Sequence, residues 1–116
     1  MSEKVANMRN TKLHTKRARE AWPFLVSRAN SGGEPYTYID LGREIGGVHQ
    51  RVAGYYLGVI QDECAKQKWP MLQALAVNAG TKVPGRGYHG ARGKEDHGAE
   101  IMRVRAKKNW SMVPPF

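Results

Sequence analysis

The stretch Tyr36-Thr37-Tyr38-Ile39-Asp40-Leu41-Gly42-Arg43-Glu44-Ile45-Gly46-Gly47 decides the fold that we expect. Thr37 is a suitable helix N-cap, and Asp40, three residues later, is placed as in a capping box. The apolar residues of the stretch, which would form its buried side, are Ile39, Leu41 and Ile45. Gly46-Gly47 would end the helix after about two turns. The pattern therefore predicts a short helix followed by a glycine turn.

A longer helix is expected directly after this turn, from His49 to Lys68. Apolar residues recur there at helical spacing, as on one face of a helix that packs on a core. The residues expected to point inward are Val52, Tyr55, Tyr56, Val59, Ile60 and Cys64. Two helices joined by a short glycine turn form a helix-turn-helix, an arrangement common in DNA-binding proteins.

Another amphipathic helix is predicted before this motif, over residues 13–30. Its apolar residues recur at spacings of three and four: Ala18, Ala21, Trp22, Leu25, Val26 and Ala29. Pro23 falls within the run, so the helix should either begin near Trp22 or be kinked there.

Strand and loop signals follow the motif. Residues 71–78 are short, apolar and bounded by turn signals, which favours a buried strand. Residues 79–94 contain five glycines and one proline, too many for a helix, and are interpreted as a hairpin or loop, the wing. Residues 95–108 have a partly apolar helical pattern, and Trp110 should pack back on the domain.

The sequence thus predicts a small α+β winged-helix fold in a single domain. We expect a flexible basic arm at residues 1–12, the winged-helix domain at residues 13–110 and a tail at residues 111–116. The 116 residues are too few for two domains with separate cores.

Positive charge is concentrated at both ends of the chain. There are 19 Lys or Arg and 10 Asp or Glu, a net charge of +9. Residues 1–19 have six basic residues and one acid, residues 79–116 have eight and three, and residues 20–78 have five and six. A near-neutral core between basic arms is typical of a protein that binds a polyanion. We expect double-stranded DNA as the partner, with an acidic protein or membrane surface as alternatives.

Other features narrow the class of protein. No apolar run approaches the roughly 18 residues of a membrane span, and no apolar segment of a secretory signal follows the basic residues 1–20. The one cysteine, Cys64, cannot form an internal disulfide or a cysteine-based zinc cluster. We expect a cytoplasmic protein, nucleoid-associated when bound to DNA, with no cofactor and no membrane partner.

The order of residues through the two helices carries a family resemblance. The residues concerned are Thr37-Tyr38, Leu41, Ile45-Gly46, Arg51-Val52-Ala53-Gly54 and Leu57. Their order resembles the DNA-binding half of the alkylguanine-DNA alkyltransferases and of their catalytically silent, alkyltransferase-like relatives. Pro70-Met71-Leu72 and Gly85-Arg86-Gly87-Tyr88 resemble the strand and glycine-rich loop that follow in that family. The resemblance covers residues 36–88.

The resemblance implies roles for two residues. Arg51 matches the arginine that family members insert into the duplex in place of an extruded nucleotide. Tyr38 matches the tyrosine that helps to rotate this nucleotide by crowding its phosphate. A guanidinium is planar and always charged, so it can fill the vacated position. Ala53 and Gly54 are small and would let the helix approach closely through the minor groove.

The nucleophile of that family is missing. It lies in a Pro-Cys-His-Arg segment, where this chain has Gln-Ala-Leu-Ala-Val-Asn at residues 73–78. Alkyl transfer needs a thiolate formed beside a base. Cys64 lies on the preceding helix next to Asp62 and Glu63, which would raise the pKa of its thiol. The sequence therefore predicts no enzyme, but a protein that recognises modified or flipped bases without catalysis.

Nine residues are predicted to contact DNA, and those on the wing would neutralise phosphates. They are Thr37, Tyr38, His49, Gln50, Arg51, Lys82, Arg86, Arg92 and Lys94. The three tryptophans, in contrast, are expected to pack in or beside the core.

Two other functions remain open at this stage. The domain could be an interaction module in a larger assembly that binds RNA or an acidic partner. A metal-dependent nuclease would use imidazole and carboxylate ligands, which suit such a metal. Its ligands would be His89, Asp96, His97 and Glu100. No complete metal-ligand spacing is present, so we predict no metal site.

Overall fold

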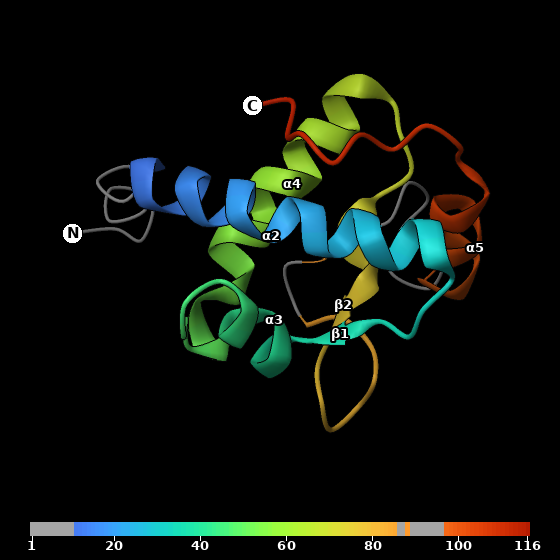
Figure 1. Cartoon of the computed structure of the whole chain (residues 1–116). Coiled ribbons are helices and arrows are strands. Elements are labelled where there is room, and N and C mark those ends of the chain that lie inside the picture. The colour runs from blue at the N-terminus through green and yellow to red at the C-terminus, as the bar shows by residue number, and fades with distance from the viewer. Residues whose placement is uncertain (1–10, 86–87, 89–96) are drawn as a thin grey trace.

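Four α-helices and a two-stranded parallel sheet make up most of the structure, a computed structural model that describes residues 11–85, 88 and 97–116 (Figure 1). The elements in chain order are α2 (Thr11–Ser31), β1 (Tyr36–Thr37), α3 (Tyr38–Glu44), the 3₁₀ helix η1 (Gln50–Val52), α4 (Ala53–Gln67), the 3₁₀ helix η2 (Leu72–Leu75), β2 (Ala76–Val77) and α5 (His97–Ala106). Within these residues, no helix is both long and apolar enough to cross a bilayer.

Helix α2 crosses the molecule in front of α4 (Figure 1). Its predicted inner face is confirmed, because all six apolar residues named for it are buried. The helix begins at Thr11, inside the segment predicted to be an arm, and continues through Pro23, so a start near Trp22 is wrong. A proline removes one backbone hydrogen bond, but the buried residues on both sides of Pro23 form one continuous face that packs on the core.

The predicted N-cap of α3 is confirmed. The Thr37 hydroxyl oxygen accepts a hydrogen bond from the Asp40 N–H at 3.1 Å. The turn after α3 depends on Gly42, whose carbonyl accepts the N–H groups of Gly47 and Val48, each at 2.9 Å. A Cβ atom on Gly42 would lie only 2.0 Å from the Val48 carbonyl oxygen. The short helix can therefore fold back at this point only with glycine at position 42.

The helix predicted from His49 to Lys68 is present as η1 followed by α4. Its buried residues are Ala53, Tyr56, Leu57, Ile60 and Cys64. Tyr55, which was expected to point inward, is 42% exposed. Its ring instead stacks on the buried ring of His14 in α2, with centroids 4.8 Å apart. Of the expected inner residues of α3, Leu41 and Ile45 are buried but Ile39 is only partly so.

The strand predicted over residues 71–78 is wrong for most of its length. Leu72–Leu75 form the 3₁₀ helix η2, and only Ala76–Val77 are extended. They pair in parallel with β1, Tyr36 opposite Ala76 and Thr37 opposite Val77. Residues 71–77 are all buried, and an apolar run alone does not distinguish a buried strand from a buried helical turn.

The described part of the expected wing is a tight loop over residues 78–85. The Asn78 side-chain oxygen accepts the N–H groups of Gly80 and Thr81, and the Asn78 N–H donates to the Val83 carbonyl at 2.9 Å. These bonds close the tip of the loop, residues 78–83, from within. The remainder of the predicted wing, residues 86–87 and 89–94, lies outside the described residues.

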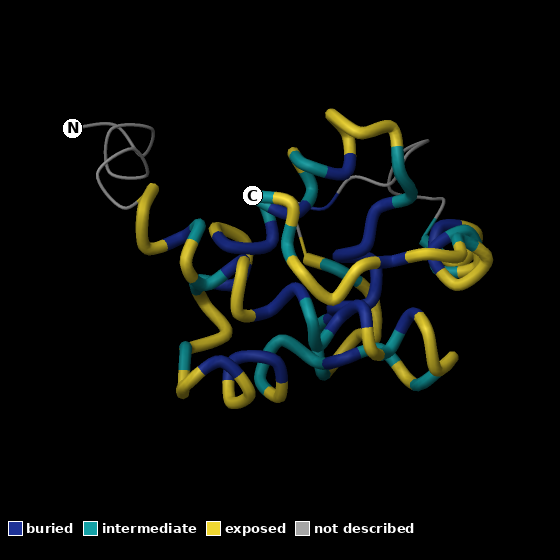
Figure 2. Tube along the Cα trace, turned by 45° about the horizontal axis from the view of Figure 1, so that its top comes forward, coloured by how far each residue is buried: buried dark blue, intermediate teal, exposed yellow. Residues whose placement is uncertain are grey.

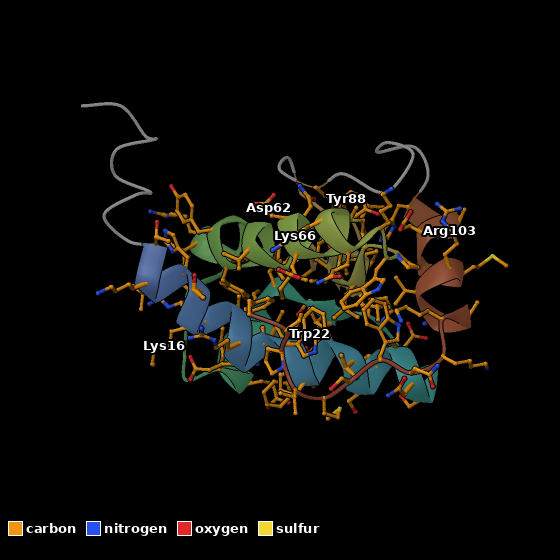
Figure 3. All side chains as sticks on the ribbon, turned by 90° about the horizontal axis from the view of Figure 1, so that it is seen from above. Lys16, Trp22, Asp62, Lys66, Tyr88 and Arg103 are labelled. Carbon is orange, nitrogen blue, oxygen red and sulfur yellow. The ribbon has the colours of Figure 1, made fainter. Side chains whose placement is uncertain are left out.

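The core ends in an aromatic cluster that the last residues cover. Trp22 contacts Trp69, Trp110 and Phe116 with ring centroids 5.7–6.4 Å apart. Its indole N–H donates to the Ser111 carbonyl at 2.7 Å. The expected packing of the three tryptophans is confirmed, and Figure 3 places Trp22 between α2 and the interior. Residues 110–116, here called the C-terminal strap, thus hold α2 on the core.

Helix α5 lies within the predicted residues 95–108. It is fixed by Glu100, whose fully buried carboxylate accepts the Met71 N–H at 2.7 Å and pairs with Arg103 at 2.6 Å. Figure 2 shows the buried segments of the different elements meeting at the centre of the trace. The bond from Glu100 therefore ties α5 to the segment that leads into η2.

Candidate nucleic-acid interface

A cavity of about 500 Å³ lies between α3, η1, the first turns of α4 and the segment around β2. This volume is in the range of small-molecule sites. The described residues that line it are Tyr38, His49, Gln50, Arg51, Ala53, Gly54, Leu57, Gly58, Gln61, Gln73, Asn78, Gly85 and Tyr88. Four of the residues predicted to bind DNA are brought together here: Tyr38, His49, Gln50 and Arg51.

One wall of the cavity is a face of α4. Gly54, Gly58 and Gln61 follow one another at spacings of four and three residues and so share this face. A Cβ atom on Gly54 or Gly58 would meet nothing within 4 Å, so the two glycines leave open space. Of these three residues, only Gly54 was predicted from the sequence to lie at the interface. Gly58 and Gln61 were missed, although their helical spacing from Gly54 indicates that they share its face.

Another wall comes from η2. The Gln73 side-chain N–H donates to the Gln61 side-chain oxygen at 2.9 Å, which joins η2 to α4 across the cavity. Gln73 is 96% buried, since its exposed fraction is 4%. Gln73 was predicted only to belong to the segment that lacks a nucleophile, and not to line a site. The sequence signal that could have identified it is a polar residue within the otherwise apolar run of residues 71–77.

Tyr38 joins α3 to the loop after β2. Its hydroxyl oxygen accepts the Gly85 N–H at 2.6 Å. Burial raises the pKa of Tyr38, while the bond from Gly85 partly offsets this, so the hydroxyl is neutral near pH 7. Because the oxygen accepts in this bond, its proton can be donated to another group. Tyr38 therefore holds the loop and offers a hydrogen-bond donor at the cavity.

His49 is the N-cap of η1, the 3₁₀ helix that contains Arg51. Its Nδ1 accepts the Arg51 N–H at 2.9 Å. A nitrogen that accepts has no proton, so a neutral His49 carries its proton on Nε2. Arg51 is exposed and lines the cavity, and its guanidinium has no hydrogen-bond or ion-pair partner among residues 11–85, 88 and 97–116. The cap fixes the backbone from which this guanidinium extends.

The other residues predicted to contact DNA either lie away from the cavity or are not among the described residues. Thr37 is used as the cap of α3 and does not line the cavity. Lys82 is exposed in the loop of residues 78–85, in a left-handed conformation with a φ of 62°. Arg86, Arg92 and Lys94 lie outside the described residues.

Several cations elsewhere are engaged in contacts within the chain. Arg28 lies over the Tyr36 ring at 3.9 Å, and Arg105 donates to the Gly33 carbonyl at 2.8 Å. Lys107 lies over the Trp69 and Trp110 rings at about 5 Å. The side chains of Arg51, which lines the cavity, and of Lys82, in the loop after β2, have no such partner in the described part of the chain. These two cations are therefore available to an external anion, whereas Arg28, Arg105 and Lys107 are engaged within the chain.

The groups considered for chemistry are used in packing. Burial raises the pKa of the Cys64 thiol to about 11, and Glu63 and Glu100 add to the effect. The sequence had attributed this rise to Asp62 and Glu63, but burial is the larger cause. His97 Nε2 lies 2.9 Å from the Ala74 carbonyl oxygen. His89 and Asp96 lie outside the described residues. Among the residues that are described, no three His, Cys, Asp or Glu side chains lie close enough together to hold a metal ion.

The chain matches no model of a known protein family, no curated protein and no solved structure.

Proposed function

We propose that this chain binds double-stranded DNA in the manner of an alkyltransferase-like winged-helix protein. In this proposal the start of α4 faces a groove, Arg51 enters the duplex, and the cavity accepts an extruded nucleotide. The loop of residues 78–85 takes the position of a wing and offers Lys82 to a phosphate. No bond in the DNA is made or broken.

The observation that carries the proposal is the position of Arg51 beside an open cavity. The guanidinium is exposed and unpaired in the described structure, and the same residue lines the cavity with Tyr38. A protein that extrudes a base needs a group to fill the gap in the duplex and a pocket to receive the base. In this structure Arg51 and the cavity are adjacent, at the start of the same helix.

The lining of the cavity supports an occupant that is flat and polar at its edge. Gly54 and Gly58 leave space for a ring to lie on α4, and the side chains of Gln61 and Gln73 supply amide groups. Flipped bases are held by stacking on one face and by hydrogen bonds to their edges. The described lining contains no carboxylate that would repel a nucleotide.

The proposal of binding without reaction rests on the side chains near the cavity. Residues 73–78 stand where the alkyltransferases that the motif resembles have their nucleophile; they include neither Cys nor His, and residues 73–77 are buried. The thiol of Cys64 is in the core, with its pKa raised to about 11. Neither an activated thiol nor an adjacent base is available to accept an alkyl group.

The test measures duplex affinity and base extrusion together. Duplexes with and without an O6-alkylated guanine are titrated at fixed salt, and a 2-aminopurine at the same position reports unstacking by increased fluorescence. We expect tighter binding of the modified duplex and a several-fold fluorescence rise. Arg51→Ala should reduce both, whereas Lys16→Ala, on the solvent side of α2, should reduce neither. Equal affinity for both duplexes, with Arg51→Ala no weaker than Lys16→Ala, would refute extrusion.

A second variant separates the cavity from the rest of the interface. Gly58→Leu places a side chain in the cavity while the phosphate contacts remain. It should abolish the preference for the modified duplex and leave the affinity for plain duplex nearly unchanged. The same titration with RNA duplex and single strands completes the test, because tighter binding of RNA would contradict duplex DNA as the partner.

A further inference from the structure

The first turns of α2 and α4 are joined at the surface by two aromatic rings. His14 of α2 and Tyr55 of α4 stack with an interplanar angle of 15°. His14 is 8% exposed, and neither of its ring nitrogens has a hydrogen-bond partner among the described residues. Tyr55 is four residues after Arg51, in the first turn of α4, and so lies close to the helix start from which Arg51 extends. The stack therefore places the start of α2 beside the proposed DNA-binding helix.

The contacts of α2 show which of its flanks faces α3. Phe24 and Arg28 both pack on Tyr36 of β1, which leads directly into α3. Arg17 precedes Phe24 by seven residues, about two helical turns, and so lies on the same flank. Arg19 lies on the other flank, where its Nε donates to the Phe116 carbonyl at 2.7 Å. Arg17 is thus on the side of α2 that faces the proposed interface.

Electrostatic effects agree with this position. Burial lowers the pKa of His14, and the charge of Arg17 adds to this effect. The same charge opposes the rise in the pKa of Tyr56 that burial and Tyr38 produce. Arg17 therefore lies near α4. It has no acidic partner among the described residues, whereas its neighbour Lys16 pairs with Glu20 at 3.6 Å.

We infer that Arg17 and Tyr55 bind the phosphate backbone of the duplex beside Arg51, so that the interface extends from α4 onto α2. An arginine and a tyrosine hydroxyl are common phosphate ligands. The stack on His14 holds the Tyr55 ring at the surface, and Arg17 is one turn further along α2. The inference rests on the proposed DNA binding and names the part of DNA that this strip contacts.

The experiment measures duplex affinity for the full chain at several salt concentrations. Removing a phosphate contact from a lysine or arginine lowers the slope of log affinity against log salt by about one unit. Arg17→Ala should show this loss and bind several-fold more weakly, while Arg17→Lys should largely restore both. Tyr55→Phe keeps the stack but loses the hydroxyl, so it should weaken binding without changing the slope. Lys16→Ala is the control, since it removes one charge from the outer side of α2 (Figure 3).

The outcomes separate the inference from the proposed function. If Arg17→Ala and Tyr55→Phe both match Lys16→Ala while Arg51→Ala binds more weakly, α2 does not contact DNA and the inference is overturned. If the unmodified chain binds no duplex, the proposed function and the inference are both overturned. Thermal unfolding of each variant identifies any loss of binding that is caused by misfolding.

Discussion

His49 and Arg51 are linked by a bond that serves two purposes. The Nδ1 of His49 accepts the Arg51 N–H at 2.9 Å, which caps η1 and orients the residue proposed to enter DNA. His49→Ala should therefore lower the free energy of unfolding by about 1 kcal/mol, the typical value of a lost N-cap. His49→Asn supplies another capping oxygen and should recover most of it. Urea unfolding measures both, and equal stability of the two variants would contradict a capping role.

Gly42 is predicted to be irreplaceable in the turn after α3. A Cβ atom there would lie 2.0 Å from the Val48 carbonyl oxygen, which cannot move without breaking the turn. Gly42→Ala should cost about 2–3 kcal/mol, as overpacking of a tight contact does. Gly54→Ala is the matched control in α4, where nothing lies within 4 Å, and it should stabilise by about 0.5–1 kcal/mol. Similar unfolding midpoints for the two variants would refute the steric argument.

Glu100 should be a main stabilising residue of the C-terminal part. Its side chain is fully buried, accepts the Met71 N–H and pairs with Arg103. Glu100→Ala leaves a buried N–H without its partner and should destabilise the fold by about 2–4 kcal/mol. The more exposed Glu63 accepts a hydrogen bond from Gln67 in the same helix and has no other hydrogen bond among the described residues, so Glu63→Ala should change stability by less than about 0.5 kcal/mol. Calorimetry compares the two, and a small effect at Glu100 would contradict its role.

The buried His14 should make stability depend on pH. Burial first, and then the charge of Arg17, lower the pKa of His14 below its usual value of 6.5. The unfolded chain then binds the proton more readily, so stability is fully present above the unfolded pKa and falls as pH drops through it. His14→Phe can keep the ring stack with Tyr55 but cannot titrate. Between about pH 7 and 5, thermal unfolding should shift more for the parent chain, and parallel curves would disprove this.

Cys64 should be inert until the protein unfolds. The side chain is fully buried, and its pKa is raised to about 11, so the thiolate that reacts with disulfide reagents is scarce. Labelling with 5,5′-dithiobis(2-nitrobenzoic acid) at pH 8 should be slow in buffer and complete within minutes in denaturant. An O6-methylguanine duplex should transfer no methyl group, as mass spectrometry of the chain would show. Rapid labelling of the folded chain would contradict the buried thiol.

Local signals predicted the local parts of this fold well. Thr37 caps α3 because the capping geometry involves only residues 37–40, and the inner face of α2 follows from helical spacing alone. The error at residues 71–75 arose because burial removes the alternation that distinguishes strands from helices. Tyr55 was misplaced because the partner that covers one side of its ring, His14, lies on another helix. Sequence spacing contains no information about such a partner.

In the candidate site, too, local sequence signals identified some residues, while others come together only in the folded chain. Tyr38, His49, Gln50 and Arg51 were identified from the motif and its resemblance, and all four line the cavity. Gln73 was missed as a lining residue because it reaches Gln61 only after η2 has packed on α4. The bond between Tyr38 and Gly85 likewise joins residues that the sequence separates by 47 positions.

The C-terminal strap has a consequence for the order in which the chain can fold. The Trp22 indole bonds to the Ser111 carbonyl, 89 positions later in the sequence. Contacts between residues so far apart form late, since the intervening chain must first be ordered. During translation, α2 would leave the ribosome with the Trp22 side chain uncovered, and Trp22 would stay so until residues 110–116 had also emerged. Although α2 is synthesised before α3, α4 and α5, its packing would thus be completed after theirs.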